Sequence, residues 1–140
     1  MSNTATLTLE TVEGSGLRFG CRAGGGTQTS IDSGPDPMAP SPVEMLLVAL
    51  GGCGAMDVIG ILRKQRQAVS GYRVQVTGWR REEHPRAFTR IEIVHRLNGR
   101  DLSPEAIEEA IRLSDTKYCS VHASLSPEIE IESRYEIVGE

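Results

Sequence analysis

The chain has 140 residues, 39% of them hydrophobic and 24% charged, which is typical of a single globular domain spanning residues 1–140. Its net charge of −4, with basic residues scattered along the chain, gives no electrostatic support for nucleic-acid binding. The first ten residues lack the basic start and apolar run of a signal peptide, and no segment holds about 18 uninterrupted apolar residues. We therefore expect a cytoplasmic protein that binds neither nucleic acid nor membrane.

The first third of the chain has the pattern of β structure. Alternating and β-branched residues predict three strands, near residues 4–10, 17–21 and 27–32. Three glycines at residues 24–26 predict the turn between the second and third strands. Leu17, Phe19 and Cys21 fall on one face of the second strand, so we interpret Cys21 as a core residue. Four prolines within residues 33–42 exclude a helix there and predict an extended connector.

A long helix follows this connector. Ser41 is a good N-cap, Pro42 suits the first helical position, and Glu44 completes a capping box three residues after the cap. We expect the helix to end near Ala68, after a basic last stretch that suits the helix dipole. Its apolar residues spread around most of its circumference, which in a chain of this length indicates a second subunit.

The remainder of the chain predicts three more strands and a second helix. The strands lie near residues 72–79, 88–97 and 129–137, and the helix begins at Ser103 and is followed by a turn and a short helix. The element order is therefore βββ-α-ββ-α-β, which is an α+β fold rather than an alternating α/β fold.

Three cysteines are too few, and odd in number, for a disulfide framework. Cys53 lies twelve residues after the N-cap, about 18 Å along the helix, too far for the helix dipole to lower its thiol pKa. Activation would need a partner such as an arginine, and Asp57 at i+4 would act against it. Three neighbouring glycines leave space beside Cys53, namely Gly51, Gly52 and Gly54. This space could admit a second backbone, a small ligand or a second thiol. The alternative is that the glycines allow close packing between helices.

Cys119 follows the second helix and lies at the predicted start of a short helix. The backbone N–H groups at that helix start would favour the thiolate form of Cys119. The alternative is that Cys119 has only a capping or packing role. His122 is either a base or ligand, or a capping or surface residue. A metal site formed by Cys53, Cys119, His122 and Cys21 is a weaker alternative, because no CxxC or HxxxH spacing occurs, and we expect no metal. The other histidines, including His95, have no supporting context.

Two segments together, SPVEMLLVALGGCGAMDVIGILRK at 41–64 and KYCSVHASL at 117–125, resemble the OsmC/Ohr family. The resemblance covers nearly the whole chain, and it is carried by the two cysteines combined with the element order. It implies an intertwined homodimer in which the long central helices pack in the middle, against antiparallel sheets.

The resemblance also implies a reaction. Peroxidase members of the family reduce organic hydroperoxides or hydrogen peroxide with no cofactor. Cys53 matches the peroxidatic position, which becomes a sulfenic acid, and Cys119 matches the resolving position, which condenses with it to a disulfide. An external dithiol reductant then restores both thiols. The glycines around Cys53 would give clearance for the peroxide and for the Cys119 sulfur.

Two further roles transfer less directly. The peroxidases pair the reactive thiol with an arginine and hold that arginine with a glutamate. In this chain Arg18 is the predicted match for the arginine, and Arg22 is the alternative. Glu44 stands one residue later than in the family's Asn-Pro-Glu, so capping alone is its alternative role. The segment beginning at Cys119 also lacks the Cys-Pro of the peroxidase branches. In these departures the chain resembles another branch of the family, whose members are called OsmC-like or redox proteins.

Two other functions fit the same residues. The first is a non-enzymatic binding module that holds an apolar small molecule in a dimer crevice lined by Met45, Leu50 and Met56. The second is a thiol redox sensor whose disulfide changes a partner surface.

Overall fold

The computed structural model describes residues 1–11 and 13–140. The chain forms two compact units, Met1–Leu46 and Leu47–Glu140. The first unit is mainly β, and the second contains the longer strands and most of the helical residues. The long helix α1, Pro42–Lys64, begins in the first unit and continues into the second.

The first unit contains a three-stranded antiparallel sheet. Its strands are β1 (Ala5–Leu9), β2 (Arg18–Ala23) and β3 (Gln28–Asp32), paired in the order β1-β2-β3. Gly26 has a φ of 90°, which only glycine adopts without strain, and it lies in the turn between β2 and β3. The three predicted strands and the glycine turn are therefore confirmed.

The proline-rich connector is tied back to the end of β3 by Asp32. The Asp32 carboxylate accepts hydrogen bonds from the backbone N–H groups of Gly34, at 2.9 Å, and Met38, at 3.0 Å. The Asp32 N–H donates to the carbonyl of Pro40 at 3.0 Å. The two bonds to the carboxylate lower the pKa of Asp32. An extended connector was expected, and this aspartate gives it a defined path.

Helix α1 ends earlier than the sequence suggested. Its last residue is Lys64, and Arg66 adopts a left-handed conformation with a φ of 57°. The Gln67 N–H donates to the carbonyl of Leu62 at 2.9 Å, which closes a Schellman-type cap. The prediction of an end near Ala68 was wrong because arginine, unlike glycine, gives no sign of a left-handed residue.

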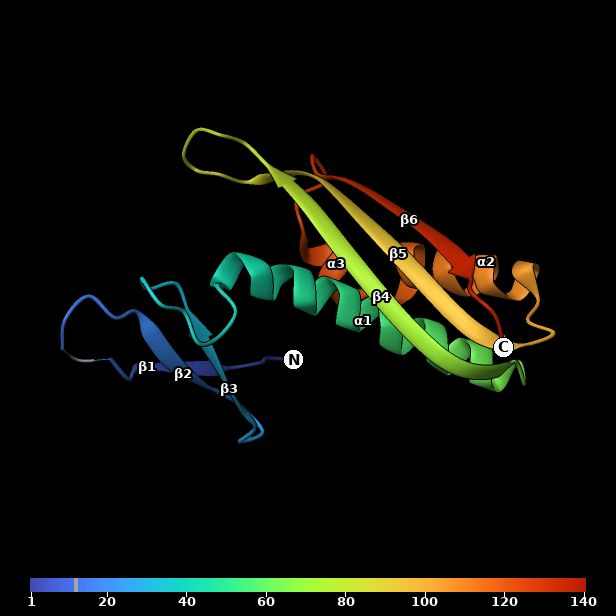
Figure 1. The fold of residues 1–140 in the computed structure, drawn as a ribbon, viewed down its shortest axis with the longest axis horizontal. Helices are drawn as coiled ribbons and strands as arrows, with labels where there is room; N and C mark the ends of the chain where they lie inside the picture. Colours follow the sequence, from blue (N-terminus) through green and yellow to red (C-terminus); the bar gives the residue numbers. More distant parts are fainter. Residues whose placement is uncertain (12) are drawn as a thin grey trace. The chain divides into compact units, whose positions relative to one another are not determined.

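The second unit contains a mixed three-stranded sheet (Figure 1). Strand β4 (Ala68–Arg80) pairs antiparallel with β5 (Phe88–Arg100), and β5 pairs parallel with β6 (Glu130–Ile137). The expectation that all sheets are antiparallel is therefore wrong for β6. The chain crosses from β5 to β6 through the helical segments α2 (Pro104–Leu113), η1 (Ser114–Tyr118) and α3 (Ser120–Ser124), and such a crossover allows a parallel strand.

The core of the second unit lies between this sheet and its helices. Its buried residues come from α1, β5, α2 and the loop before α2: Val58, Leu62, Leu97, Leu102, Ile107, Ala110 and Ile111. Tyr72 of β4 and Tyr135 of β6 are half-buried against the same cluster. In Figure 1, α1 and α2 lie along the same face of the sheet, as this shared core requires. The mixed α+β fold class is confirmed.

Much of the apolar surface of α1 is not covered. By length and composition alone, α1 is apolar enough to cross a membrane, with a mean hydropathy of 2.1, a test that the core helix of a soluble protein also passes. Only 28% of that apolar window is buried. Val48 and Met56 are 57% and 75% exposed. The helix therefore presents large apolar side chains that the rest of the second unit leaves open.

Gly51 provides a test of how tightly α1 packs on β4. A Cβ atom at Gly51 would lie 2.6 Å from Cγ2 of Val76, whereas a Cβ at Gly60 of the same helix would meet no atom within 4 Å. We expect Gly51→Ala to lower the free energy of unfolding by about 1–2 kcal/mol, since overpacking outweighs the gain in helix propensity. The matched Gly60→Ala should raise it by about 0.5–1 kcal/mol. Chemical denaturation measures both, and equal effects at the two positions would contradict this packing.

Candidate functional site

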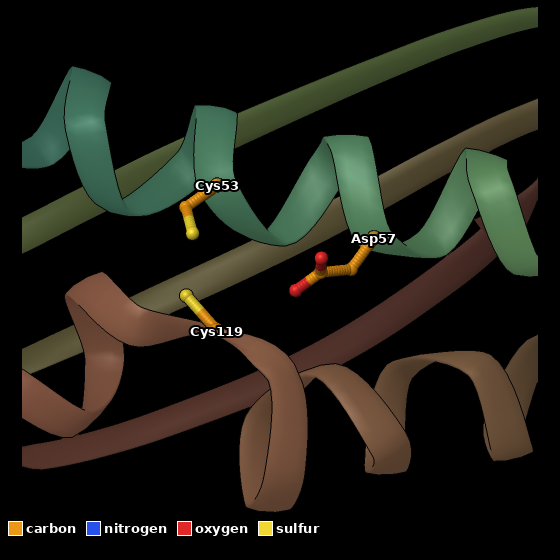
Figure 2. A group of neighbouring side chains, drawn as sticks. All are labelled: Cys53, Asp57 and Cys119. Carbon is orange, nitrogen blue, oxygen red and sulfur yellow. The ribbon is translucent and has the colours of Figure 1, made fainter. Parts of the chain in front are cut away.

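Two thiols and a carboxylate meet inside the second unit. The sulfur atoms of Cys53 and Cys119 and a carboxylate oxygen of Asp57 all lie within 4.8 Å of one another. Figure 2 shows the two sulfurs pointing toward each other, with the Asp57 carboxylate on the same side of α1. Both cysteines are free thiols. A disulfide bond is about 2.05 Å long, so modest side-chain movements would bring the sulfurs into bonding range.

The α1 helix determines the position of Asp57 relative to Cys53. Residues four apart lie on the same face of a helix, so the two side chains project together. The hydroxyl of Ser114, which is only 2% exposed, donates a hydrogen bond of 2.9 Å to Asp57 Oδ2. This bond holds the carboxylate beside the thiols, and it joins residues 57 positions apart, which no local sequence pattern reveals.

The position of Cys119 is set by the backbone on both sides. The Cys119 N–H donates to the carbonyl of Ser114 at 2.9 Å, the wide spacing of a π turn. Cys119 is then the N-cap of α3, where its sulfur accepts the N–H of His122 at 3.4 Å. The short helix was expected, but the π turn was not, because single-turn π segments have no distinctive sequence pattern.

Burial decides the ionisation of Cys119. The residue is 5% exposed, and this burial raises the pKa of its thiol to about 11. The N–H of His122 lowers the pKa, as expected at the start of a helix, while the nearby Cys53 raises it. Burial raises the pKa of the Cys119 thiol more than the backbone hydrogen bond lowers it. The expectation that the helix start favours a thiolate at Cys119 was therefore wrong. Cys119 is protonated at neutral pH.

This raised pKa predicts a pH dependence for alkylation of Cys119. Only the thiolate reacts, so its fraction, and with it the rate, rises as the pH approaches the pKa. In the Cys53→Ser variant, where burial remains, we expect the midpoint to stay above the ordinary value of 9.0. Mass spectrometry that resolves the Cys119 peptide from the Cys21 peptide measures the rate at each pH. A midpoint at or below 9.0 would show that burial does not control this thiol.

Glu44 forms the predicted capping box. The Ser41 N–H donates to Glu44 Oε1 at 3.0 Å, and the Glu44 N–H donates to Ser41 Oγ at 3.1 Å. The first of these bonds is the main cause that lowers the pKa of the Glu44 carboxyl. The carboxylate is thus used in capping α1, and a second role toward an arginine stays a prediction.

The two candidate arginines lie on β2 in the first unit. Arg18 forms an ion pair with Glu10, with Nε and Oε2 3.1 Å apart. Arg22 is exposed. Arg18 and Arg22 are four residues apart on one strand, so both project from the same face of β2. Pairing of either guanidinium with Cys53 stays a prediction.

Cys21 and His122 lie outside the group of three ligand atoms. Cys21 is only half-buried on β2, in the first unit, so the prediction that it is a core residue was wrong. Its sulfur lies 3.9 Å from the carbonyl oxygen of Phe19. His122 Nδ1 is buried without a hydrogen-bond partner in the described part of the chain, and lies 3.7 Å from Asp115 Oδ1. His122 therefore contributes its backbone N–H to the thiol site, rather than its ring.

His95 is a buried polar residue whose context the sequence did not provide. It is 2% exposed, and its Nδ1 shares a hydrogen bond of 2.6 Å with the hydroxyl of Tyr72. The two rings are stacked, with centroids 5.9 Å apart. Burial lowers the pKa of His95, so the ring is neutral at neutral pH. The burial of His95 could have been inferred from its position two residues before Leu97, which places both side chains on the core-facing side of β5.

Comparison with known proteins places this architecture among described relatives. The family model described as "OsmC-like protein" matches residues 34–134. The chain is 45% identical over 124 residues to protein YhfA of Escherichia coli K12, covering 89% of this chain and 92% of YhfA. It also resembles the crystal structure of a hypothetical protein from Aquifex aeolicus, with a TM-score of 0.83, 32% identity, and coverage of 100% of this chain and 98% of that one.

Organic hydroperoxide resistance proteins share the fold. The protein from Elizabethkingia anophelis gives a TM-score of 0.67 at 12% identity, covering 98% of this chain and 96% of that one. OhrB of Bacillus subtilis gives a TM-score of 0.60 at 13% identity, covering 97% and 98%. At these identities the similarity extends to the fold alone.

Proposed function

Because this chain belongs to the OsmC-like protein family, whose fold is shared with organic hydroperoxide resistance proteins, we propose that it is a thiol-dependent peroxidase. Its substrates would be organic hydroperoxides or hydrogen peroxide. Cys53 is the peroxidatic cysteine and Cys119 the resolving cysteine. The observation that carries this proposal is the placement of these two sulfurs within 4.8 Å of each other.

The first half of the reaction takes place at Cys53. Its thiolate attacks one oxygen of the hydroperoxide and the O–O bond breaks. The sulfur becomes a sulfenic acid, and the other oxygen leaves as an alcohol, or as water from hydrogen peroxide, after taking up a proton. Because the thiolate is the nucleophile, the rate depends on how well the site stabilises negative charge on this sulfur.

The second half takes place between the two cysteines. The Cys119 sulfur attacks the sulfenic sulfur, a disulfide forms, and the hydroxyl leaves with the Cys119 proton as water. The cytoplasm, where we place the protein, supplies dithiols that reduce the disulfide by exchange and return two electrons. Cys119 is almost fully buried, which suits a thiol that reacts with its neighbour rather than with solutes.

The proposal includes an arginine beside Cys53. A carboxylate oxygen of Asp57 lies within 4.8 Å of both sulfurs, and a negative charge there disfavours a thiolate. A cation is therefore needed to compensate. Our first candidate is Arg18, which Glu44 would hold in place of its present partner Glu10, and Arg22 is the alternative. Comparing the peroxide rates of Arg18→Met and Arg22→Met distinguishes them: the arginine that acts on Cys53 is the one whose loss slows the reaction.

We further propose that the protein is a homodimer in which a second copy covers α1. An apolar groove on the second unit is lined by α1 and β4 residues, among them Leu47, Val48, Ala55, Val74 and Val76. Val48 is 57% exposed in the single chain. An apolar groove beside exposed residues of this size is typical of an interface between subunits.

The dimer predicts a specific response to a charge at Val48. We expect the unaltered chain to sediment as a dimer and Val48→Glu to shift it toward monomer, because a carboxylate would be buried without a partner. Val48→Ile, which keeps the apolar character, is the control. A monomeric unaltered chain, or a dimer insensitive to Val48→Glu, would contradict this interface.

The direct test of the proposed activity is the rate at which the reduced protein consumes an alkyl hydroperoxide, compared with free cysteine at the same pH. We expect the protein to react faster, since the site must stabilise the thiolate and the transition state. A rate no faster than that of free cysteine, together with a co-purified apolar ligand in native mass spectrometry, would favour the binding-module alternative.

A further inference from the structure

We propose that the reduced protein binds one Zn²⁺ ion per chain through the sulfurs of Cys53 and Cys119 and the carboxylate of Asp57. Two thiols and a carboxylate are ligands that zinc takes in proteins. The pair of sulfurs selects a thiophilic ion over magnesium or calcium, which prefer oxygen. The binding itself does not depend on peroxidase activity.

The spacing of the three ligand atoms fits a tetrahedral ion. Zinc–sulfur bonds of about 2.3 Å place two ligands of a tetrahedron about 3.8 Å apart. The three ligand atoms already lie within 4.8 Å of one another. No pair therefore needs to close by more than about 1 Å, or slightly more for a sulfur and the carboxylate oxygen, and small side-chain rotations supply such movements.

Two of the three ligands are already held in place. The Ser114 hydroxyl donates a hydrogen bond to Asp57 Oδ2 and fixes the carboxylate as an outer-sphere partner does in zinc sites. Cys119 is held by the π turn before it and by the His122 N–H after it. Preorganised ligands lose less conformational entropy when the ion binds.

The charges in the site also favour a cation. A carboxylate oxygen of Asp57 lies within 4.8 Å of both sulfurs, so the three ligand groups together carry negative charge once the thiols ionise. A divalent ion would neutralise the Asp57 carboxylate and the thiolates that form on binding. Zinc binds thiolates rather than thiols, so binding releases protons and the affinity should rise with pH.

Zinc and peroxide would compete for the same sulfur. A Cys53 thiolate bound to Zn²⁺ cannot attack a hydroperoxide, and a Cys53–Cys119 disulfide offers no thiolate to the ion. The site would thus bind zinc only when reduced and be inactive while zinc is bound. This consequence, unlike the binding, rests on the proposed peroxidase function.

Titration of the reduced full chain with Zn²⁺ under anaerobic conditions tests the site. Calorimetry with a competing chromophoric chelator should give one ion per chain. Cys53→Ser and Cys119→Ser should each weaken binding by about 100-fold or more, and Asp57→Asn by about 10-fold or more, since loss of an outer-sphere partner alone costs about 10–100-fold. Cys21→Ser removes a thiol outside the site and is the matched control, with affinity unchanged.

Two further measurements make the result decisive. Each variant's thermal unfolding is recorded first; if Asp57→Asn fails to fold, the two cysteine variants decide. Protein oxidised by diamide, a thiol oxidant that is not a peroxide, should no longer bind Zn²⁺. Failure of the unaltered protein to bind, or equal weakening by Cys21→Ser, would overturn the zinc site. Zinc binding without peroxide reduction would support the zinc site and refute the peroxidase, and the reverse result would do the opposite.

Discussion

Replacement of Cys53 by serine is expected to lower hydroperoxide turnover by about 1000-fold or more. A serine hydroxyl is not ionised at neutral pH and cannot form a sulfenic acid, so the first step has no nucleophile. The fold should be retained, since the side chain is only half-buried and serine is of similar size. The measurement is the consumption of an alkyl hydroperoxide in the presence of excess dithiol.

The matched control is Cys21→Ser, which also removes one thiol. Cys21 lies on β2 in the first unit and is not part of the Cys53–Cys119 pair. We expect this variant to keep the unaltered protein's turnover. Full turnover in Cys53→Ser, or a large loss in Cys21→Ser, would assign the chemistry to a different sulfur.

Replacement of Cys119 by serine should separate the two halves of the reaction. Cys53 keeps its nucleophile, so the first turnover should proceed, but the sulfenic acid has no neighbouring thiol to condense with. It should accumulate to about one per chain and react with a sulfenic-acid probe. With excess peroxide it should advance to the sulfinic acid, which is irreversible, and activity should decline with each cycle.

The unaltered protein under the same conditions should form a disulfide and resist this over-oxidation. Mass spectrometry of the Cys53 peptide distinguishes a disulfide, a sulfenic acid and a sulfinic acid by mass. If the Cys119→Ser protein still formed a disulfide through Cys21, or showed no over-oxidation, Cys119 would not be the resolving cysteine.

Local signals in the sequence were sufficient for most of the fold. The capping box at Ser41 and Glu44 gave the start of α1, and the alternation of polar and apolar residues gave all six strands. Alternation shows which face a residue occupies but not which way a strand runs. The signal for the parallel pairing of β6 was the helix predicted between the last two strands, because such a crossover is the usual connection of parallel strands. The end of α1 was missed because Arg66 takes a conformation usually left to glycine.

The candidate site was predictable only in part. The resemblance to the OsmC/Ohr family predicted Cys53 and Cys119 as a pair, whereas the Ser114–Asp57 bond depends on the packing of α1 against the π turn. The glycines near Cys53 were expected to give clearance to peroxide and sulfur. The structure gives Gly51 a different role, since it allows α1 to approach Val76 of β4. A glycine in a predicted helix shows that space exists beside the helix backbone, but the sequence does not show which atoms fill that space.

The central claim is that Cys53 and Cys119 form one redox pair. Its most direct test is treatment of the reduced protein with one equivalent of an alkyl hydroperoxide, followed by alkylation of the remaining thiols and mapping of the disulfides. We predict an intramolecular Cys53–Cys119 bond in nearly every chain, with Cys21 alkylated. Chains in which both Cys53 and Cys119 remain alkylatable, or in which the bond joins another pair, would contradict it.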